Sequence, residues 1–417
     1  MKILLLGLYY SENKGDALLT DCVAARIRRS FPDSELTVCD LFGRTGWKTA
    51  SGGEEADLKK RIFKNKLRTF ASSYTPWDKM YSHEQYLYEM HRADMERVMS
   101  ISCDCVVFAG GQLLMDDLAL VVSSYIDHFA AMEIPVIINA AGWGPFYSRH
   151  VRERLAQSLQ NRWTIDLSVR DHASAISRLV GRKVPERADF GLFADITYGI
   201  HRDPESNRTG LGIMYAPTIS RGKMIRFWQG LILQLARKGI AWTLFTNGYP
   251  SDEEFARDLL KLLPEECFRT GKNRRDYLLP APGTPREMTA QISSFQSLIS
   301  MRLHSHIVAA SLGIPSVAIT WDNKLPEFFR MLGYPERCLS IHESADQVIS
   351  MITQAEKDGI NRDTVNALRE AADKSLVSSI RKATDKSLLT SIRKTSDRSL
   401  LTSIHEAKNT HSQREEE

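Results

Sequence analysis

The chain has 417 residues and a formal net charge of +4, with 55 Lys and Arg against 51 Asp and Glu. Its length suffices for two ordinary domains and an extension. A charge this small gives no indication of a nucleic-acid partner, and no apolar run reaches the roughly 20 residues that span a bilayer. The six cysteines form no CxxC pair and no zinc-like Cys/His spacing, so we expect a reduced cytoplasmic protein without a metal site.

Residues 1–198 are predicted to form a first Rossmann-like domain. It opens with an apolar strand at residues 2–8, a polar loop, a helix at 17–30 and a second strand at 34–41. Neither GxGxxG nor GxxxxGK[ST] follows the first strand. We therefore expect neither a dinucleotide nor a P-loop nucleotide at this turn.

The polar loop after the first strand is a candidate contact for sugar hydroxyls. Asn13, Gly15 and Asp16 place an amide and a carboxylate over a tight turn. The alternative interpretation is that Asp16 only caps the following helix, since Asp is a preferred N-cap residue.

Residues 42–100 interrupt the alternation of strands and helices and are predicted to be an insertion. A basic amphipathic segment lies at residues 59–68, and aromatic residues follow it at 74, 77, 81, 86 and 88. Basic amphipathic helices bind anionic membranes, so peripheral contact with the inner face of the membrane is one hypothesis. The other is a solvated helical excursion with ordinary packing aromatics.

Three further strands of the first domain end in residues that suit a ligand. They are expected at residues 105–108, 135–139 and 165–169. Glycines, which let backbone approach a ligand closely, follow the first two. These glycines are Gly110, Gly111, Gly142 and Gly144. Arg170 follows the third strand and supplies a guanidinium.

Residues 199–345 are predicted to form a second Rossmann-like domain. Strands are expected at 211–215 and 242–246, and helices at 223–238 and 252–263. Two such domains that face each other form a cleft, which is the usual place for a ligand.

The sequence 297–324 is the centre of the predicted site. A short strand runs into Arg302 and His304, and a second strand is followed by Lys324. Because the carboxyl ends of parallel strands hold the ligand in such domains, these cations are expected to converge with Arg170 on one crevice. Such a site suits a small polyanion and a proton transfer. The alternatives are that His304 only caps or packs its helix and that Arg302 only braces the loop.

Residues 346–417 are predicted to be a helical extension that ends in a repeat. A 12-residue unit that begins at Asp373 recurs from Asp385 and, degraded, from Asp397. This period rotates each copy by about 120° on a helix of 3.6 residues per turn, so no continuous apolar seam forms. We expect a partly helical, poorly packed tail; oligomerisation through it is the alternative.

The ordered set of strand ends resembles the polysaccharide pyruvyl transferase family over residues 1–345. The matching segments are residues 13–16, 110–111 with Leu113 and Asp116, 142–145, 168–171, 188–189, 301–304 and 313–315, and Lys324. The chain departs from the family at residues 10–12, which contain fewer glycines than is common, and at Ala109 and Gln112, which flank a glycine pair where longer runs are usual. The resemblance implies a glycosyltransferase-B-like pair of domains.

The resemblance also implies a reaction and the residues that perform it. Phosphoenolpyruvate is the implied co-substrate, no cofactor is needed, and the product is a pyruvate ketal on a saccharide. His304 is the implied catalytic residue, with Arg170 and Lys324 as donor-binding residues. Arg302 is a further donor-binding candidate because of its own guanidinium and its position at a strand end. The implied acceptors are capsule, exopolysaccharide or cell-wall precursors, including lipid-linked ones.

Elementary chemistry agrees with these roles. Phosphoenolpyruvate carries a phosphate and a carboxylate, which planar guanidinium groups and an ammonium bind well. Protonation of its methylene carbon needs a group that titrates near neutral pH, and an unperturbed histidine does so at about 6.5. Two alternatives remain: a glycosyltransferase of the same architecture that uses a nucleotide sugar, and a non-catalytic assembly protein.

Overall fold

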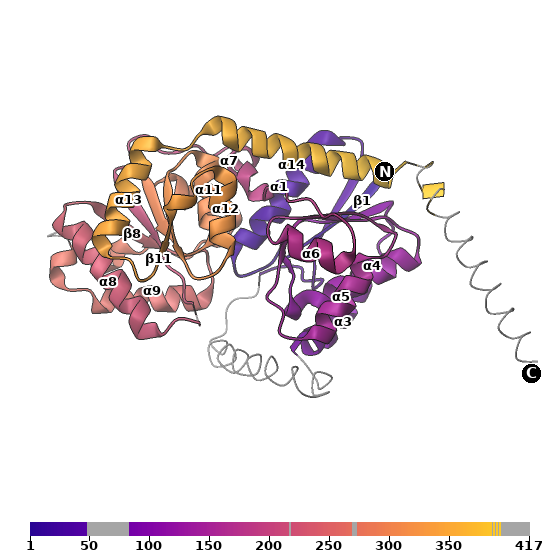
Figure 1. Ribbon diagram of the computed structural model, residues 1–417, viewed down its shortest axis with the longest axis horizontal. Coiled ribbons are helices and arrows are strands. Elements are labelled where there is room, and N and C mark those ends of the chain that lie inside the picture. Colours follow the sequence, from indigo (N-terminus) through magenta and orange to yellow (C-terminus); the bar gives the residue numbers. More distant parts are fainter. Residues whose placement is uncertain are drawn as a thin grey trace, which may run out of the picture.

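The computed structural model describes residues 1–47, 83–216, 218–268 and 273–385, together with residues 387, 389, 390 and 392. These residues form two α/β domains that lie side by side, each built on a parallel sheet (Figure 1). The predicted fold of two Rossmann-like domains facing across a cleft is confirmed. The basic segment at 59–68 and the repeat beyond residue 392 lie outside the described residues.

The first sheet combines six parallel strands. Its order is β2-β1-β3-β5-β4, and β6 pairs with β5. The strands are β1 (Lys2–Gly7), β2 (Glu35–Asp40), β3 (Cys105–Phe108), β4 (Gly111–Leu114), β5 (Val136–Trp143) and β6 (Thr164–Val169). Every residue of β3 is buried, as expected for an apolar strand covered on both faces. The strand β4 was not predicted, because it begins at the second residue of a glycine pair that indicates a loop.

Helices cover both faces of this sheet. They are α1 (Lys14–Ser30), α3 (His83–Met99), α4 (Ala119–Ala131), α5 (Arg149–Leu159), α6 (Ala173–Val180) and α7 (Ala194–Tyr198). The helix α1 begins three residues earlier than predicted. Asn13 is its N-cap and accepts a hydrogen bond from the backbone N–H of Gly15. The alternative that Asp16 caps this helix is therefore wrong, and its carboxylate lies in the first turn.

The second sheet has five parallel strands in the order β11-β10-β9-β7-β8. They are β7 (Arg208–Gly212), β8 (Ala241–Phe245), β9 (Ser297–Ser300), β10 (Ser316–Thr320) and β11 (Cys338–Ser340). Its helices are α8 (Arg221–Arg237), α9 (Pro250–Leu262), α10 (Pro285–Ser293), α11 (Leu303–Leu312), α12 (Lys324–Leu332) and α13 (Ala345–Asp358).

The strand order of both sheets reverses at the place where a ligand is expected. The reversal lies between β1 and β3 in the first sheet and between β7 and β9 in the second. Loops beyond the carboxyl ends of strands at such a reversal leave a crevice between them. The backbone N–H of Lys14 donates to the carbonyl of Asn247 at 2.9 Å, so these ends of the two domains meet.

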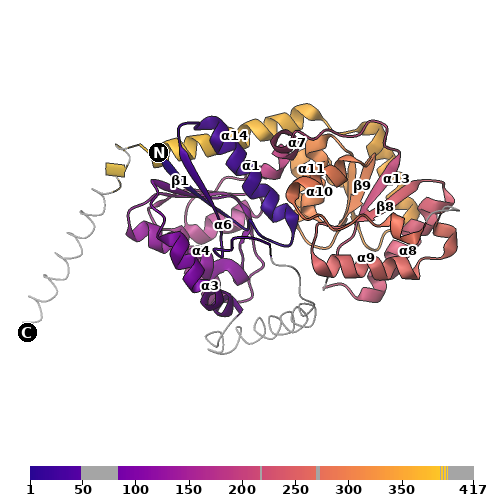
Figure 2. The same cartoon turned by 180° about the vertical axis from the view of Figure 1, so that it is seen from behind.

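The two domains share one apolar core. Leu18 of α1 and Ile307 of α11 belong to the same buried cluster, as does Leu376 of α14 (Arg362–Ala383). The helix α14 lies along both domains in Figures 1 and 2. A shared core of this kind fixes the orientation of the two sheets and hence of the loops between them.

Polar contacts attach α14 to both domains. Its first turn is bound to the second domain, since Arg362 donates to the carbonyl of Ser311 at 2.7 Å. Farther along, Asp373 accepts two hydrogen bonds from Arg26 of α1, at 2.9 and 2.6 Å. Arg369, which is buried, donates to the carbonyl of Leu192 at 2.7 Å.

The prediction that the tail packs poorly is wrong for the first copy of its repeat. Leu376, Ile380 and Ala383 of that copy are at most 1% exposed. They are spaced by four and three residues, so they form one apolar stripe on α14. The stripe is not evident when the copies are considered together, because each copy is rotated about the helix axis relative to the one before it.

Truncation of this stripe should weaken the whole fold. Ile380→Ala leaves a cavity beneath α14 and is expected to lower the free energy of unfolding by about 2–5 kcal/mol in urea denaturation. Lys374→Ala, on the exposed side of the same helix, should change it by less than about 0.5 kcal/mol. Equal effects of the two substitutions would show that α14 does not dock as described.

Candidate active site

Loops from both domains enclose a polar cleft of about 210 Å³. Each loop follows the carboxyl end of a strand: β1, β6, β9 and β10 are followed by charged side chains, and Gln112 lies within β4. The ionisable side chains that line the cleft include Asp16, Arg170, Arg302, His304, Asp322 and Lys324. The structure thus brings all four predicted cationic residues to one cleft.

His304 occupies the first turn of α11 and is only 5% exposed. Its Nε2 lies 3.1 Å from Nη1 of Arg170. Because a guanidinium only donates hydrogen bonds, Nε2 must accept, and the network assigns the ring proton to Nδ1. The Nδ1 atom faces Oδ1 of Asp16 at 3.9 Å. The resting imidazole is therefore neutral.

Burial is the main cause that lowers the pKa of His304 below its ordinary value. The carboxylates of Asp189 and Asp16 oppose this shift, and the cations Arg170 and Lys324 reinforce it. A ligand that brings negative charge into the cleft would counteract the repulsion from the two cations. Such a ligand would favour the protonated imidazole.

Gly15 holds the imidazole against the first domain. A Cβ atom at residue 15 would lie 2.2 Å from Nδ1 of His304 and 2.4 Å from its Cγ. Any side chain there would displace the ring. The tight turn inferred from the sequence thus has a second role, which is to let α1 approach the histidine of the other domain.

Arg170 is buried at the end of β6 and is bound to several partners. Its Nη1 donates to Oδ2 of Asp189 at 2.6 Å, and its Nη2 donates to Oε1 of Gln112 at 3.3 Å. Its Nε lies 3.6 Å from Oδ2 of Asp171 and has no hydrogen-bond partner within the described ranges. The guanidinium is therefore oriented from three sides, and its Nε–H is buried beside Asp171.

Lys324 begins α12 and points into the same cleft. Burial is the main cause that lowers the pKa of its ammonium group, although Asp322 acts in the opposite direction. The two groups are 3.6 Å apart, which is a looser pair than that of Arg170 and Asp189. Among these cations Lys324 is accordingly the more readily recruited by an anion, and the N–H groups at the start of α12 add a favourable dipole.

Arg302 is held by the second domain. Its Nε and Nη2 both donate to Oδ2 of Asp252, at 2.8 and 2.5 Å. Its guanidinium also lies 5.5 Å from the ring centre of Tyr249. Although Arg302 lines the cleft, this geometry favours the interpretation that it braces the loop over a role in ligand binding.

The remaining predicted residues divide into two groups. Asn13 and Asp16 line the cleft, and a Cβ atom at Gly142 would lie 2.5 Å from Gln112 and 3.1 Å from Arg170. The other three glycines, Gly110, Gly111 and Gly144, have positive φ angles of 69–95° and do not line the cleft.

Two residues of the site were missed at the sequence level. Gln112 orients Arg170 and also donates to the carbonyl of Gly144. Asp189 holds Arg170 and accepts a hydrogen bond from the N–H of Gly191 at 2.8 Å. The sequence contains one signal for each residue. Gln112 directly follows a glycine pair, and Asp189 stands at the end of an extended segment. Neither position reveals a partner that lies 58 or 19 residues away.

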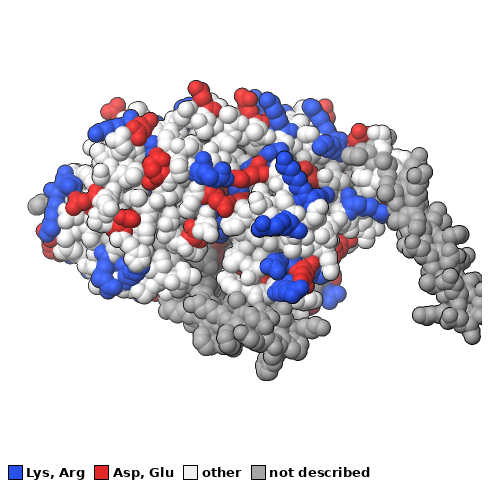
Figure 3. All heavy atoms as spheres, viewed as in Figure 1, with Lys and Arg blue, Asp and Glu red and all other residues white. Residues whose placement is uncertain are grey.

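Within the part of the chain that the structure describes, no group of three or more His, Cys, Asp or Glu side chains is arranged to hold a metal ion. No described helix combines the length and the hydrophobicity needed to cross a membrane. On the face seen in Figure 3, basic and acidic side chains are interspersed.

The model of the family "Polysaccharide pyruvyl transferase" matches residues 13–323 of this chain. The chain belongs to this family. The match includes the loop that begins at Asn13, the strand end at Arg170 and the segment of His304, and it ends one residue before Lys324. The family indicates an enzyme that modifies polysaccharides.

Solved structures of low sequence identity share the fold. The UDP-GlcNAc 2-epimerase of Neisseria meningitidis, bound to UDP-GlcNAc, is 14% identical over 92% of this chain and 100% of its own, with a TM-score of 0.51. The UDP-GlcNAc 2-epimerase of Methanocaldococcus jannaschii, in complex with UDP-GlcNAc and UDP, is 11% identical over 85% and 93%, with a TM-score of 0.50. No curated protein sequence is similar enough to count as a match.

A second buried histidine of α11 should make stability depend on pH. Burial lowers the pKa of His306 to about 4, and its Nε2 lies 3.0 Å from the carbonyl of Ser300. Between pH 6.5 and 4 the unfolded chain binds this proton and the folded chain does not. The free energy of unfolding should fall by about 3 kcal/mol from this residue as the pH is lowered through that range.

The measurement is urea denaturation at pH 7 and pH 4 for wild type and His306→Gln. The variant should lose less stability than wild type over this interval. His201→Gln, at an exposed position, should behave as wild type. Identical pH dependence in all three proteins would contradict the assignment.

Proposed function

We propose that this enzyme transfers the pyruvyl group of phosphoenolpyruvate to two hydroxyl groups of a saccharide, forming a ketal and releasing phosphate. The observation that carries the proposal is the buried contact of Arg170 with His304 in a cleft that Lys324 also lines. Family membership gives the pyruvyl transfer, and this group of side chains suits the donor.

The size of the cleft favours a small donor. Pockets for drug-sized ligands enclose about 300–1,000 Å³. The cleft between the domains encloses about 210 Å³, which suits phosphoenolpyruvate better than a nucleotide sugar. The buried carboxylate Asp252 of the second domain is engaged by Arg302 and is not offered to a ribose. The nucleotide-sugar alternative therefore has less support.

The charges of the cleft suit two steps of donor binding. Lys324, whose ion pair is loose, would engage one anionic group of phosphoenolpyruvate. Arg170 would give the Nη1 N–H that now faces His304 to another. The Nε2 atom of His304 would then be free to take a proton, and the negative charge of the donor would favour the imidazolium.

The proposed reaction balances with the groups on hand. The imidazolium of His304 gives a proton to the methylene carbon of phosphoenolpyruvate, and the neighbouring carbon becomes an oxocarbenium-like centre. A sugar hydroxyl attacks this carbon and loses its proton to His304. The bond from this carbon to the phosphate oxygen then breaks with the electron pair leaving on phosphate. A second hydroxyl attacks the same carbon, which closes the ketal, and its proton passes to the departing phosphate.

No cofactor is required by these steps, so we propose phosphoenolpyruvate as the sole co-substrate. The acceptor we propose is a saccharide of a polysaccharide or of its lipid-linked precursor. Phosphoenolpyruvate is a cytoplasmic metabolite, so we place the reaction in the cytoplasm, with peripheral contact at the inner membrane face where the precursor is lipid-linked.

Substitution of the three side chains should separate catalysis from donor binding. His304→Ala should lower kcat by about 100- to 10,000-fold, as expected for the loss of a proton donor. Lys324→Ala and Arg170→Gln should raise the KM for phosphoenolpyruvate by at least about tenfold through the loss of charge-assisted contacts. The assay is phosphate release from phosphoenolpyruvate with a pool of oligosaccharides and lipid-linked saccharides.

Lys374→Ala is the matched control, because this lysine is exposed on α14 far from the cleft. Acceptor-dependent phosphate release that survives His304→Ala would contradict the proposed role of the histidine. Absence of both phosphate release and phosphoenolpyruvate binding by calorimetry would contradict the proposed function itself.

The pH dependence of kcat/KM and of kcat should reflect the lowered pKa of a buried histidine. The kcat/KM for phosphoenolpyruvate reports the free enzyme, in which the pKa of His304 is below its ordinary value. If the imidazolium is the reactive form, kcat/KM falls as the pH rises through that lowered pKa. The profile of kcat should fall at a higher pH, because bound donor raises the pKa. Coincident profiles for kcat and kcat/KM would contradict this account.

A further inference from the structure

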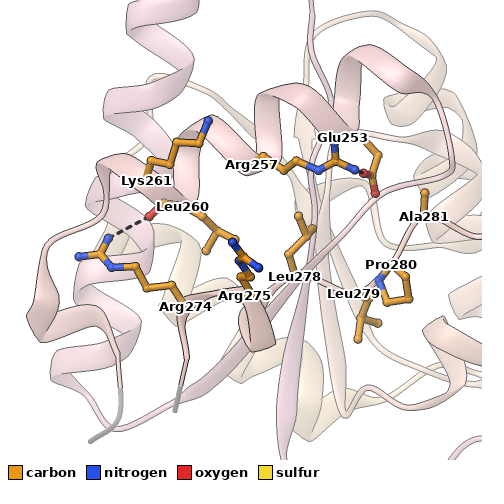
Figure 4. Close-up of a pocket in the computed structure, with 10 residues that line it drawn as sticks. All are labelled: Glu253, Arg257, Leu260, Lys261, Arg274, Arg275, Leu278, Leu279, Pro280 and Ala281. Carbon is orange, nitrogen blue, oxygen red and sulfur yellow. Dashed lines mark hydrogen bonds and ion pairs between the residues drawn. The ribbon is translucent and has the colours of Figure 1, made fainter. Parts of the chain in front are cut away.

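A larger cavity on the second domain lies apart from the candidate active site. It encloses about 720 Å³ between α9 and residues 274–281 (Figure 4). It shares no lining residue with the cleft that contains His304. Two of its basic side chains are already engaged, Arg257 by Glu253 and Arg274 by the carbonyl of Leu260. Further residues that act on the donor are therefore expected around the cleft itself.

The first turns of α12 are attached to the first domain. The helix begins at Lys324, which lines the cleft. One turn later, Oε2 of Glu327 accepts a hydrogen bond from the backbone N–H of His172 at 3.0 Å. Farther along the helix, Arg330 donates to Oε1 of Glu186 at 2.7 Å. His172 and Glu186 belong to the first domain, so these two contacts join the two walls of the cleft.

His172 meets Glu327 with both its backbone and its side chain. Its φ angle is 55°, in the left-handed region that few residues other than glycine occupy. Its Nδ1 lies 3.7 Å from Oε1 of Glu327 and 3.4 Å from Oδ1 of Asp171. Asp171 is the main cause that raises the pKa of His172, which favours an imidazolium between the two carboxylates. Glu327 thus binds two groups of one residue.

The segment that contains His172 also contains Arg170, and Asp171 links the two. Oδ1 of Asp171 accepts a hydrogen bond from the N–H of Trp143 at 2.7 Å, and its Oδ2 lies 3.6 Å from Nε of Arg170. Arg170 and Asp171 are both buried. Residues 170–172 therefore form one unit that is anchored to β5, and a residue that binds His172 is placed relative to Arg170.

The contact of Glu327 bears directly on Lys324. The two residues are three positions apart on α12, so they lie on one side of the helix. Within the described ranges, the ammonium group of Lys324 forms an ion pair only with Asp322 of its own domain, at 3.6 Å. Lys324 and Arg170 line a common cavity of about 10 Å³, which has room for about one water molecule. The place of Lys324 relative to Arg170 therefore depends on the contacts of its helix, of which that of Glu327 is the nearer one.

We propose that Glu327 is a positioning residue of the donor site. By binding His172 it holds the first turn of α12 against the segment of Arg170, so that Lys324 and Arg170 meet the two anionic groups of one donor molecule. This inference rests on the proposed function and adds a residue that acts on the donor through Lys324.

The test measures kcat and the KM for phosphoenolpyruvate by phosphate release, and the affinity by calorimetry. Glu327→Ala should raise the KM about tenfold, the size of one charge-assisted hydrogen bond, with kcat within about threefold of wild type. Glu327→Gln keeps an oxygen that accepts the N–H of His172 and should restore most of the affinity. Arg330→Gln is the matched control, because it removes the other, partly exposed contact of α12 with the first domain. It should change the KM by less than about twofold.

A double-mutant cycle shows whether Glu327 acts through the lysine. In the Lys324→Ala background, Glu327→Ala should raise the KM by less than about twofold, because the group that it positions is absent. A role confined to the stability of the domain interface would instead weaken binding equally in both backgrounds. Thermal unfolding checks that each variant folds. Glu327→Asp, which keeps the charge and shortens the side chain, gives the same comparison if Glu327→Ala does not fold.

Three outcomes would overturn the inference. They are equal effects of Glu327→Ala and Arg330→Gln on the KM, an undiminished effect of Glu327→Ala in the Lys324→Ala background, and failure of Glu327→Gln to restore affinity. Failure of wild type to bind phosphoenolpyruvate would instead overturn the proposed function. The same comparison made by calorimetry with inorganic phosphate would then still test the position of Lys324.

Discussion

The contact between Arg170 and His304 is the constraint on which the candidate site depends. One residue comes from each domain, and both are buried. Because arginine only donates, the contact fixes the imidazole in its neutral form with the proton on Nδ1. It can exist only because Gly15 leaves room for the ring and Asp189 holds the guanidinium. The imidazole is thus held uncharged.

This contact requires that the two domains keep a fixed relative orientation. The apolar cluster shared by α1, α11 and α14 and the ion pair of Arg26 with Asp373 supply that rigidity. The helix α14 reaches across both domains, so residues far from the cleft hold its two walls in place.

Much of the fold follows from local pattern. Apolar runs of four to six residues, such as those at 105–108 and 316–320, are strands because only the interior of a parallel sheet buries them on both faces. The strand β4 escaped prediction because paired glycines indicate a turn. The docking of the first repeat copy was also not predicted. An apolar stripe such as that of Leu376 and Ile380 does not indicate which surface it packs against.

The order of residues along the chain sets which side chains stand at the ends of strands, and in parallel sheets these ends meet at one edge. This pattern predicts that Arg170, His304 and Lys324 converge. How each of them is paired depends on the folded structure. Asp189 lies 19 residues from Arg170, and Asp252, in the first turn of α9, lies 50 residues from Arg302, so no local pattern links these partners. The sequence determines the charge that each side chain can carry, whereas the neutralisation of that charge depends on distances that only folding sets.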